Sequence, residues 1–137
     1  YYGIRRISSH PFFHEYNQSM TSIKLPDEGL LLRIYIGESD RSEGRPLYEA
    51  IVNKARELNL AGATVLKGIM GYGASSRIHT TKVLRLSEDL PIVVEIVDND
   101  ENINRLMPYL DEHVQEGLIT MEKIRIIKYR HNSKQSI

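Results

Sequence analysis

The sequence predicts an α+β domain in which strands and helices follow one another in the order β-α-β-β-α-β. Hydrophobic residues occupy alternate positions over residues 30–36, as in a strand with one buried face. Residues 91–97 are β-branched at almost every position, which is typical of a central strand. Hydrophobic residues at helical spacing predict helices near 46–59 and 99–115. This order is that of a ferredoxin-like sandwich, a four-stranded antiparallel sheet with two helices on one face.

The first half of the chain supplies two strands and one helix. The polar loop 37–44 follows the first strand, and Pro46 suits the first turn of the helix that comes next. Gly62 opens the second strand, which ends in a glycine-rich stretch, residues 67–76. A long polar connection, residues 74–89, then leads to the third strand.

The second half supplies the last helix and strand. We expect Asp98 to cap the helix, with Glu101 completing a capping box. Pro108 lies inside this helix and should kink it. Gly117 ends the helix, and the fourth strand is predicted over residues 118–129.

One face of the predicted sheet is too hydrophobic to be left in water. One face of the two central strands, which includes Leu30, Ile34, Ile92, Val94 and Ile96, is expected to face the helices. The other face then carries mainly hydrophobic side chains, interrupted by Arg33 and Glu95. A closed cyclic homo-oligomer would cover it, and the expected interface residues are Arg33, Tyr35 and Glu95.

Length and composition indicate one domain and exclude several classes of function. The expected organisation is an N-terminal extension (1–28), a domain (29–130) and a polar C-terminal tail (131–137). The formal net charge of +0 argues against nucleic-acid binding and adhesion to anionic membranes. No hydrophobic run reaches the length of a membrane span, and the absence of cysteine excludes thiolate metal sites. We therefore expect a cytoplasmic protein that is not inserted in a membrane.

The glycine-rich stretch is the strongest candidate for a binding site. Gly68, Gly71 and Gly73 would let the backbone take positive φ and approach a ligand closely, so that successive N–H groups cradle a phosphate. The alternative is a strand end with a β-bulge and a flexible loop.

The most specific segments of the chain are 32–38, 68–73 and 90–98. Together they resemble a family of small uncharacterised proteins related to the PII signal-transduction proteins, which are ferredoxin-like trimers. The resemblance implies a homotrimer that binds an adenine nucleotide in the cleft between subunits. It also implies two phosphate-binding loops, the glycine turn and a second loop in which Gly117 and Lys123 match.

The second loop departs from the PII pattern, because Thr120 and Glu122 replace its inner glycines. Such a loop should hold one or two phosphates better than three, which favours AMP or ADP. No catalytic residue and no metal ligand is assigned. The nucleotide-binding residues that the resemblance implies are Gly68, Met70, Gly71, Tyr72, Gly73, Arg77, Gly117, Lys123 and Arg125.

The resemblance implies a signalling protein, not an enzyme, in which the nucleotide changes how loop 74–89 engages a protein partner such as a membrane transporter or an enzyme. A metal-binding or structural trimer of the same fold, using His79 and His113, is the alternative. A small enzyme built from Ser75, Ser76 and the same histidines lacks any supporting motif. RNA binding is disfavoured, because the central strands lack paired exposed aromatic residues.

Overall fold

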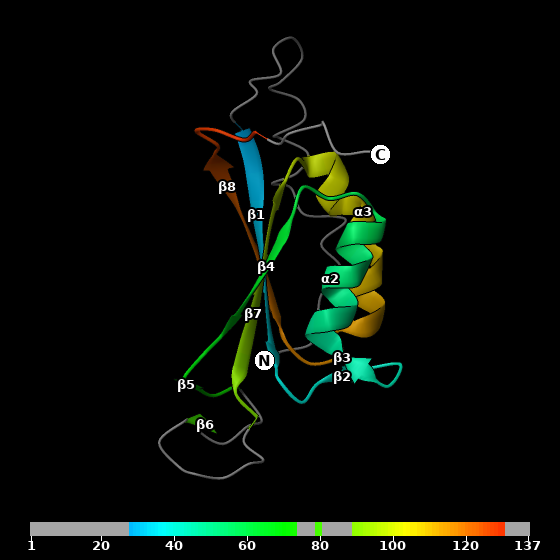
Figure 1. The fold of residues 1–137 in the computed structure, drawn as a ribbon, viewed down its shortest axis with the longest axis vertical. Coiled ribbons are helices and arrows are strands. Elements are labelled where there is room, and N and C mark those ends of the chain that lie inside the picture. The colour runs from blue at the N-terminus through cyan, green and yellow to red at the C-terminus, as the bar shows by residue number, and fades with distance from the viewer. Residues whose placement is uncertain (1–27, 74–78, 81–88, 131–137) are drawn as a thin grey trace.

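The computed structural model describes residues 28–73, 79–80 and 89–130. Figure 1 shows a sheet with both helices on the same side. The expected N-terminal extension, except Glu28, and the C-terminal tail lie outside the described residues, as do Arg77 and most of loop 74–89. The main elements are β1 (Glu28–Gly37), α2 (Leu47–Glu57), β4 (Ala63–Lys67), β7 (Pro91–Asp98), α3 (Asp100–His113) and β8 (Leu118–Arg125).

The main sheet of the described part has four antiparallel strands in the order β4-β7-β1-β8. Strands β1 and β7 lie in the centre, and β4 and β8 form the edges. The two central strands are far apart in the sequence but pair along their full length, from Leu30 opposite Asp98 to Gly37 opposite Pro91. The predicted fold class and the predicted order of the main elements along the chain are therefore confirmed.

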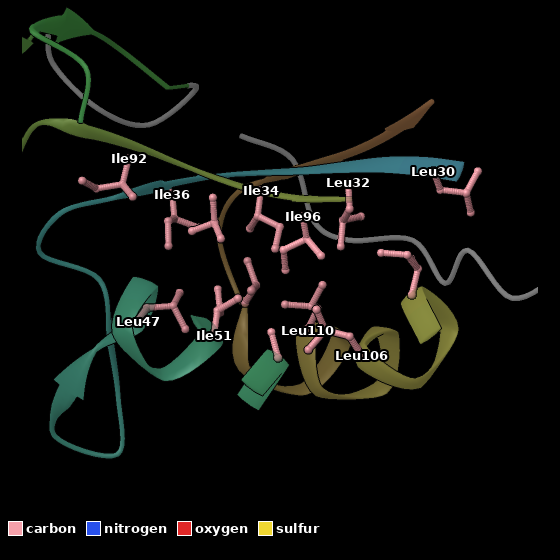
Figure 2. Packing of buried hydrophobic residues seen from close by; sticks show 14 residues of the cluster. Leu30, Leu32, Ile34, Ile36, Leu47, Ile51, Ile92, Ile96, Leu106 and Leu110 are labelled. Carbon is pink, nitrogen blue, oxygen red and sulfur yellow. The ribbon is translucent and has the colours of Figure 1, made fainter. Parts of the chain in front are cut away.

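The core lies between the sheet and the two helices, as Figure 2 shows. Alternate residues of β1 and β7 point into it, since successive side chains of a strand point to opposite faces. Helix α3 contributes residues three or four positions apart, which places them on one stripe of the helix. The central members of the cluster are Leu32, Ile34, Ile36, Ile51, Val94, Ile96, Ile103, Leu106 and Leu110, all fully buried.

The polar loop predicted between β1 and the first helix contains a small hairpin instead. Strand β2 (Arg41–Ser42) pairs with β3 (Arg45–Pro46). The two residues between them, Glu43 and Gly44, both have positive φ, at 51° and 79°. This is the backbone of a two-residue hairpin turn, and glutamate is an uncommon residue in its first position, so the sequence signal was weak. Pro46 precedes α2 as its N-cap residue and is not part of its first turn.

The cap of α3 is one residue later than predicted. Asn99 is the N-cap, and its side chain accepts a hydrogen bond from the backbone N–H of Asn102 at 2.8 Å. Asp98 is the last residue of β7 and points inward, where its carboxylate binds other groups. The capping-box prediction was wrong because the period of the strand, which buries every second side chain, already assigned Asp98 to the core face.

Helix α3 continues through Pro108. Strand β8 is shorter than expected. It ends at Arg125, whereas the prediction extended to residue 129. The segment after it leaves the strand and packs back, since Tyr129 donates a hydrogen bond to the carbonyl of Ala61 at 3.4 Å. Two further short strands, β5 (Met70–Gly71) and β6 (His79–Thr80), pair at one end of the sheet, below β4 and β7 in Figure 1.

Candidate functional site

The glycine turn, residues 68–73, begins where β4 ends. Gly68 and Gly71 do not have positive φ, so the expected backbone conformation is wrong at these two positions. Their role is close packing, because a Cβ added at Gly68 or Gly71 would lie 2.6 or 2.9 Å from Cγ of Pro91. The glycines let the turn lie directly against the first residue of β7.

Part of the backbone of this turn is already hydrogen-bonded. The N–H of Gly68 donates to the carbonyl of Pro91 at 2.7 Å, and Met70 and Gly71 pair with β6. The N–H of Gly68 is therefore not available to a phosphate. An anion bound here would have to use later N–H groups or side chains.

The side chains of the turn point into solvent. Ile69, Met70 and Tyr72 are 75%, 58% and 72% exposed. Large hydrophobic side chains exposed on a glycine-rich turn are candidates for contact with a ligand or a partner. The ring of Tyr72 is free to stack on a base or to enter a protein interface.

The second loop implied by the resemblance is a strand in this protein. Residue 118 already belongs to β8, so Thr120, Glu122 and Lys123 form part of the sheet. Gly117 precedes the strand and packs tightly, since an added Cβ would lie 2.7 Å from the carbonyl oxygen of Tyr35. The residue pattern had predicted a strand over 118–129, and that prediction holds for residues 118–125, whereas the loop implied by the resemblance is wrong here.

Lys123 and the glycine turn lie far apart within one subunit. Lys123 pairs with Leu30, near the start of β1, while Gly68 bonds to Pro91, which pairs with Gly37 at the end of β1. About seven residues along the strand and three strand spacings separate them, or roughly 27 Å. Arg125 lies farther still, opposite Glu28. One nucleotide cannot contact both groups on the same subunit.

The segment joining β1 to β2 supports the base of the glycine turn. Lys67, the residue before Gly68, forms an ion pair with Glu38, with Nζ 2.8 Å from Oε1. The N–H of Glu38 donates to the carbonyl of Leu90, and that of Ser39 donates to the carboxylate of Asp89 at 2.6 Å. Residues on both sides of segment 68–88 are therefore held by residues 38 and 39. No role was predicted for Lys67 or Glu38, although a lysine directly before a segment with three glycines was a usable signal.

Carboxylates gather at this end of the sheet. Burial raises the pKa of Asp40, the hydrogen bond from the N–H of Gly37 lowers it, and the nearby charges of Asp89 and Glu116 raise it further, with a net upward shift. The charges of Asp89 and Glu116 therefore act on Asp40 at this end of the sheet.

Among the residues that the structure describes, no helix or strand covers the sheet face opposite α2 and α3 (Figure 1). The register places hydrophobic side chains next to one another across all four strands in one row, Leu66, Val93, Tyr35 and Leu118. The two edge members, Leu66 and Leu118, are 49% and 44% exposed.

A charged pair lies beside this row. Arg33 pairs directly with Glu95, with Nε 3.2 Å from Oε1, and Nη1 lies 3.6 Å from the carboxylate of Glu122. The hydrogen bond to Glu95 raises the pKa of the Arg33 guanidinium further above its usual value. The side chains of Arg33 and Glu95 are about one third exposed, at 33% and 32%.

The residues of the alternative functions are only partly described. The imidazole Nδ1 of His113 lies 2.8 Å from Oγ of the buried Ser42, and its ring stacks on Tyr109. The side chain of His79, and Ser75 and Ser76, lie outside the described residues. Within the described ranges, no group of three or more histidine, aspartate or glutamate side chains could hold a metal ion. Nor is any helix there long and apolar enough to cross a membrane.

Solved structures with the same fold include PII-like proteins. CPII from Thiomonas intermedia K12, in a structure bound to ADP and bicarbonate, aligns with a TM-score of 0.53 and 14% identity, covering 74% of this chain and 90% of that one. A putative PII-like signaling protein from Thermus thermophilus aligns with a TM-score of 0.52 and 20% identity, covering 74% and 93%. At these identities the similarity establishes the fold.

Similarity in sequence is higher to UPF0166 proteins. A UPF0166 protein of Aquifex aeolicus (strain VF5) is 40% identical over 97 residues, covering 71% of this chain and 91% of the relative. A UPF0166 protein of Methanocaldococcus jannaschii is 39% identical over 99 residues, covering 72% and 91%. The model of the family DUF190, described as "Uncharacterized ACR, COG1993", matches residues 29–126. The chain therefore belongs to the uncharacterised DUF190 family, whose fold is PII-like.

Proposed function

We propose that this protein is a noncatalytic regulator that binds an adenine nucleotide, preferably AMP or ADP, at the glycine turn. The observation that carries the proposal is the turn itself. Gly68 and Gly71 pack against Pro91, while Tyr72 and its hydrophobic neighbours remain exposed. Such a turn offers an exposed flat ring on which a base can stack.

Two observations, one on a related fold and one on this chain, support the choice of ligand. CPII from Thiomonas intermedia has the same fold and is described bound to ADP and bicarbonate, and in a second structure to ADP, AMP and bicarbonate. In the present chain, the carboxylates at the base of the turn disfavour a highly charged ligand. Both points favour AMP or ADP over ATP.

We further propose that the site is completed by a second subunit of a homotrimer. Lys123 and Arg125 contribute only if a neighbouring subunit brings its β8 next to the glycine turn, because they lie at the opposite edge and end of the sheet in their own subunit. The uncovered hydrophobic sheet face supports such an assembly. In this arrangement Arg33, Tyr35 and Glu95 belong to the interface.

The regulatory step is a change in how segment 74–89 engages a protein partner. Its flanking residues are tied to Glu38 and Ser39, so a ligand at the glycine turn acts directly at the base of the segment. For an effect on the partner, the ligand must bind one state of the segment more tightly than the other. A membrane transporter or an enzyme is the proposed class of partner, and the site of action is cytoplasmic.

Calorimetric titration tests the proposal. The full chain is titrated with AMP, ADP, ATP and cyclic AMP, with and without magnesium. Micromolar binding of AMP or ADP is expected, and Gly73→Val should abolish it while the oligomer persists. The matched control is Gly62→Val, because nothing lies within 4 Å of a Cβ added at Gly62.

Two results would contradict the proposal. If no nucleotide binds the wild-type chain, the fold is shared with PII-like proteins without the ligand. If Gly73→Val binds as tightly as the wild type and Gly62→Val, the glycine turn is only a connection. Uptake of a divalent metal ion without nucleotide would favour the alternative of a metal-binding or structural trimer.

A further inference from the structure

Lys67 is the cation closest in sequence to the glycine turn, and in this structure its ammonium group is paired with a carboxylate. It is the last residue of β4, its Nζ lies 2.8 Å from Oε1 of Glu38, and its side chain is 52% exposed. Register places Lys67 opposite Ile92 and Ile92 opposite Ile36, so the lysine extends across the end of β7 towards the end of β1. The ion pair thus draws the ammonium group towards β1.

This ion pair can be exchanged without moving the backbone. Both side chains are partly exposed, at 52% and 35%, and exposed pairs of this kind contribute little to stability. The backbone of Glu38 stays fixed when its side chain leaves, because its N–H donates to the carbonyl of Leu90 at 2.9 Å. An incoming anion of higher charge could therefore take the lysine from the carboxylate.

Three other carboxylates lie at the same end of the sheet. Asp89 accepts the N–H of Ser39, Asp40 accepts the N–H of Gly37, and Glu116 is close enough to Asp40 to act on its charge. Their negative charges stay in place when the lysine moves to a phosphate. Each phosphate charge placed at the turn therefore faces a negative potential that the single lysine offsets only in part.

We propose that Lys67 is a ligand of the nucleotide phosphate and that Glu38 is its internal competitor, which limits how many phosphate charges the site accepts. The inference rests on the proposed function and adds the residues that set its specificity. When phosphate binds, the ammonium group leaves the Glu38 carboxylate for a phosphate oxygen. The freed carboxylate then turns to solvent.

The test compares AMP, ADP and ATP binding to Glu38→Gln and Lys67→Gln by calorimetry. Removing one carboxylate charge about 8 Å from a phosphate charge should tighten binding about twofold for each such charge. Since ATP carries about two more charges than AMP, Glu38→Gln should lower the ratio of the ATP to the AMP dissociation constant about fourfold. Lys67→Gln should weaken all three, ATP most. These differences should shrink in about 1 M salt.

The matched control is Glu57→Gln, which removes a carboxylate from a similar lysine pair on α2, where Nζ of Lys54 lies 3.5 Å from Oε2 of Glu57. It changes the net charge by the same amount and should leave the ratio unchanged. Thermal denaturation confirms that each variant is folded.

The outcomes separate the two proposals. If the wild type binds a nucleotide but Glu38→Gln and Glu57→Gln give the same ratio, the competitor role is wrong and the proposed function stands. If Lys67→Gln binds as tightly as the wild type, Lys67 is not a phosphate ligand. If no nucleotide binds the wild type, both proposals fail.

Discussion

Replacing Asp98 with alanine should destabilise the fold by about 2–4 kcal/mol, because its carboxylate joins three parts of the domain. Oδ2 accepts the N–H of Ala61 at 2.7 Å, before β4. Oδ1 accepts the N–H of Asn99 at 2.7 Å and the side-chain amide of Asn102 at 2.8 Å, at the start of α3. Asp98 itself is only 8% exposed. The substitution removes all three bonds at once.

The magnitude follows from these contacts. A hydrogen bond to a charged group contributes about 1.5–3 kcal/mol, so three of them set an upper limit well above the expected loss. Ala61 and Asn99 are exposed residues, and their N–H groups can bind water once the carboxylate is gone. This compensation reduces the expected loss to about 2–4 kcal/mol.

Urea denaturation at fixed protein concentration measures the effect. With a slope of about 1.5 kcal/mol per M, the midpoint should fall by roughly 1.3–2.7 M. Asp98→Asn keeps one oxygen acceptor and should show an intermediate loss. Asp100→Asn is the control, since Asp100 accepts only one side-chain bond, from Asn104 at 3.1 Å, among the contacts described, and favours the helix N-terminus by at most about 1 kcal/mol. Equal midpoints for Asp98→Ala and Asp100→Asn would refute the role of Asp98 as a clamp.

Three further predictions concern pH, assembly and packing. The pKa of Asp40 is raised in the folded state above its ordinary value of 3.8. At a pH just above 3.8 the folded chain therefore binds more protons than the unfolded chain, and the fold loses stability as the pH rises from 3.8 through the raised pKa. Asp40→Asn should lack this loss. If the urea midpoints of the wild type and of Asp40→Asn change with pH in the same way from about pH 4 to 7, the pKa of Asp40 is not raised. Arg33→Ala should weaken the oligomer at least about tenfold, since Glu95 would be left unpaired at a covered face, and an unchanged sedimentation coefficient at low concentration would remove that idea. Gly117→Val should lower the thermal midpoint by at least about 5 °C, because its Cβ would lie 2.7 Å from the carbonyl of Tyr35, whereas Gly62→Val should change it little.

Local patterns predicted the elements and their faces well. The alternation in residues 30–36 placed Leu32 and Ile34 in the core, and both are fully buried. The same period predicted that Arg33 and Glu95 share the opposite face, and they pair directly. These predictions succeed because the period of a strand follows from its backbone alone.

Residues with two competing roles were predicted less well. Asp98 has the residue type of a helix cap, but its position in β7 turns it into the core, and Asn99 caps α3. Gly68 and Gly71 fit a turn with positive φ, but they are small because Pro91 lies against them. The sequence shows that Gly68 and Gly71 have no side chain. It does not show why, because Pro91, which leaves no room for one, belongs to another strand.

The sequence by itself determined the family, the order of the elements and the uncovered sheet face, since these depend on residue type and local spacing. Only the tertiary structure decided which groups lie together. Antiparallel pairing in the order β4-β7-β1-β8 puts the glycine turn and Lys123 at opposite edges and ends, although the resemblance had joined them in one site. The same pairing brings Glu38 to Lys67, 29 positions apart, at the base of the turn. Strand order and register set these distances because they connect residues that are remote along the chain.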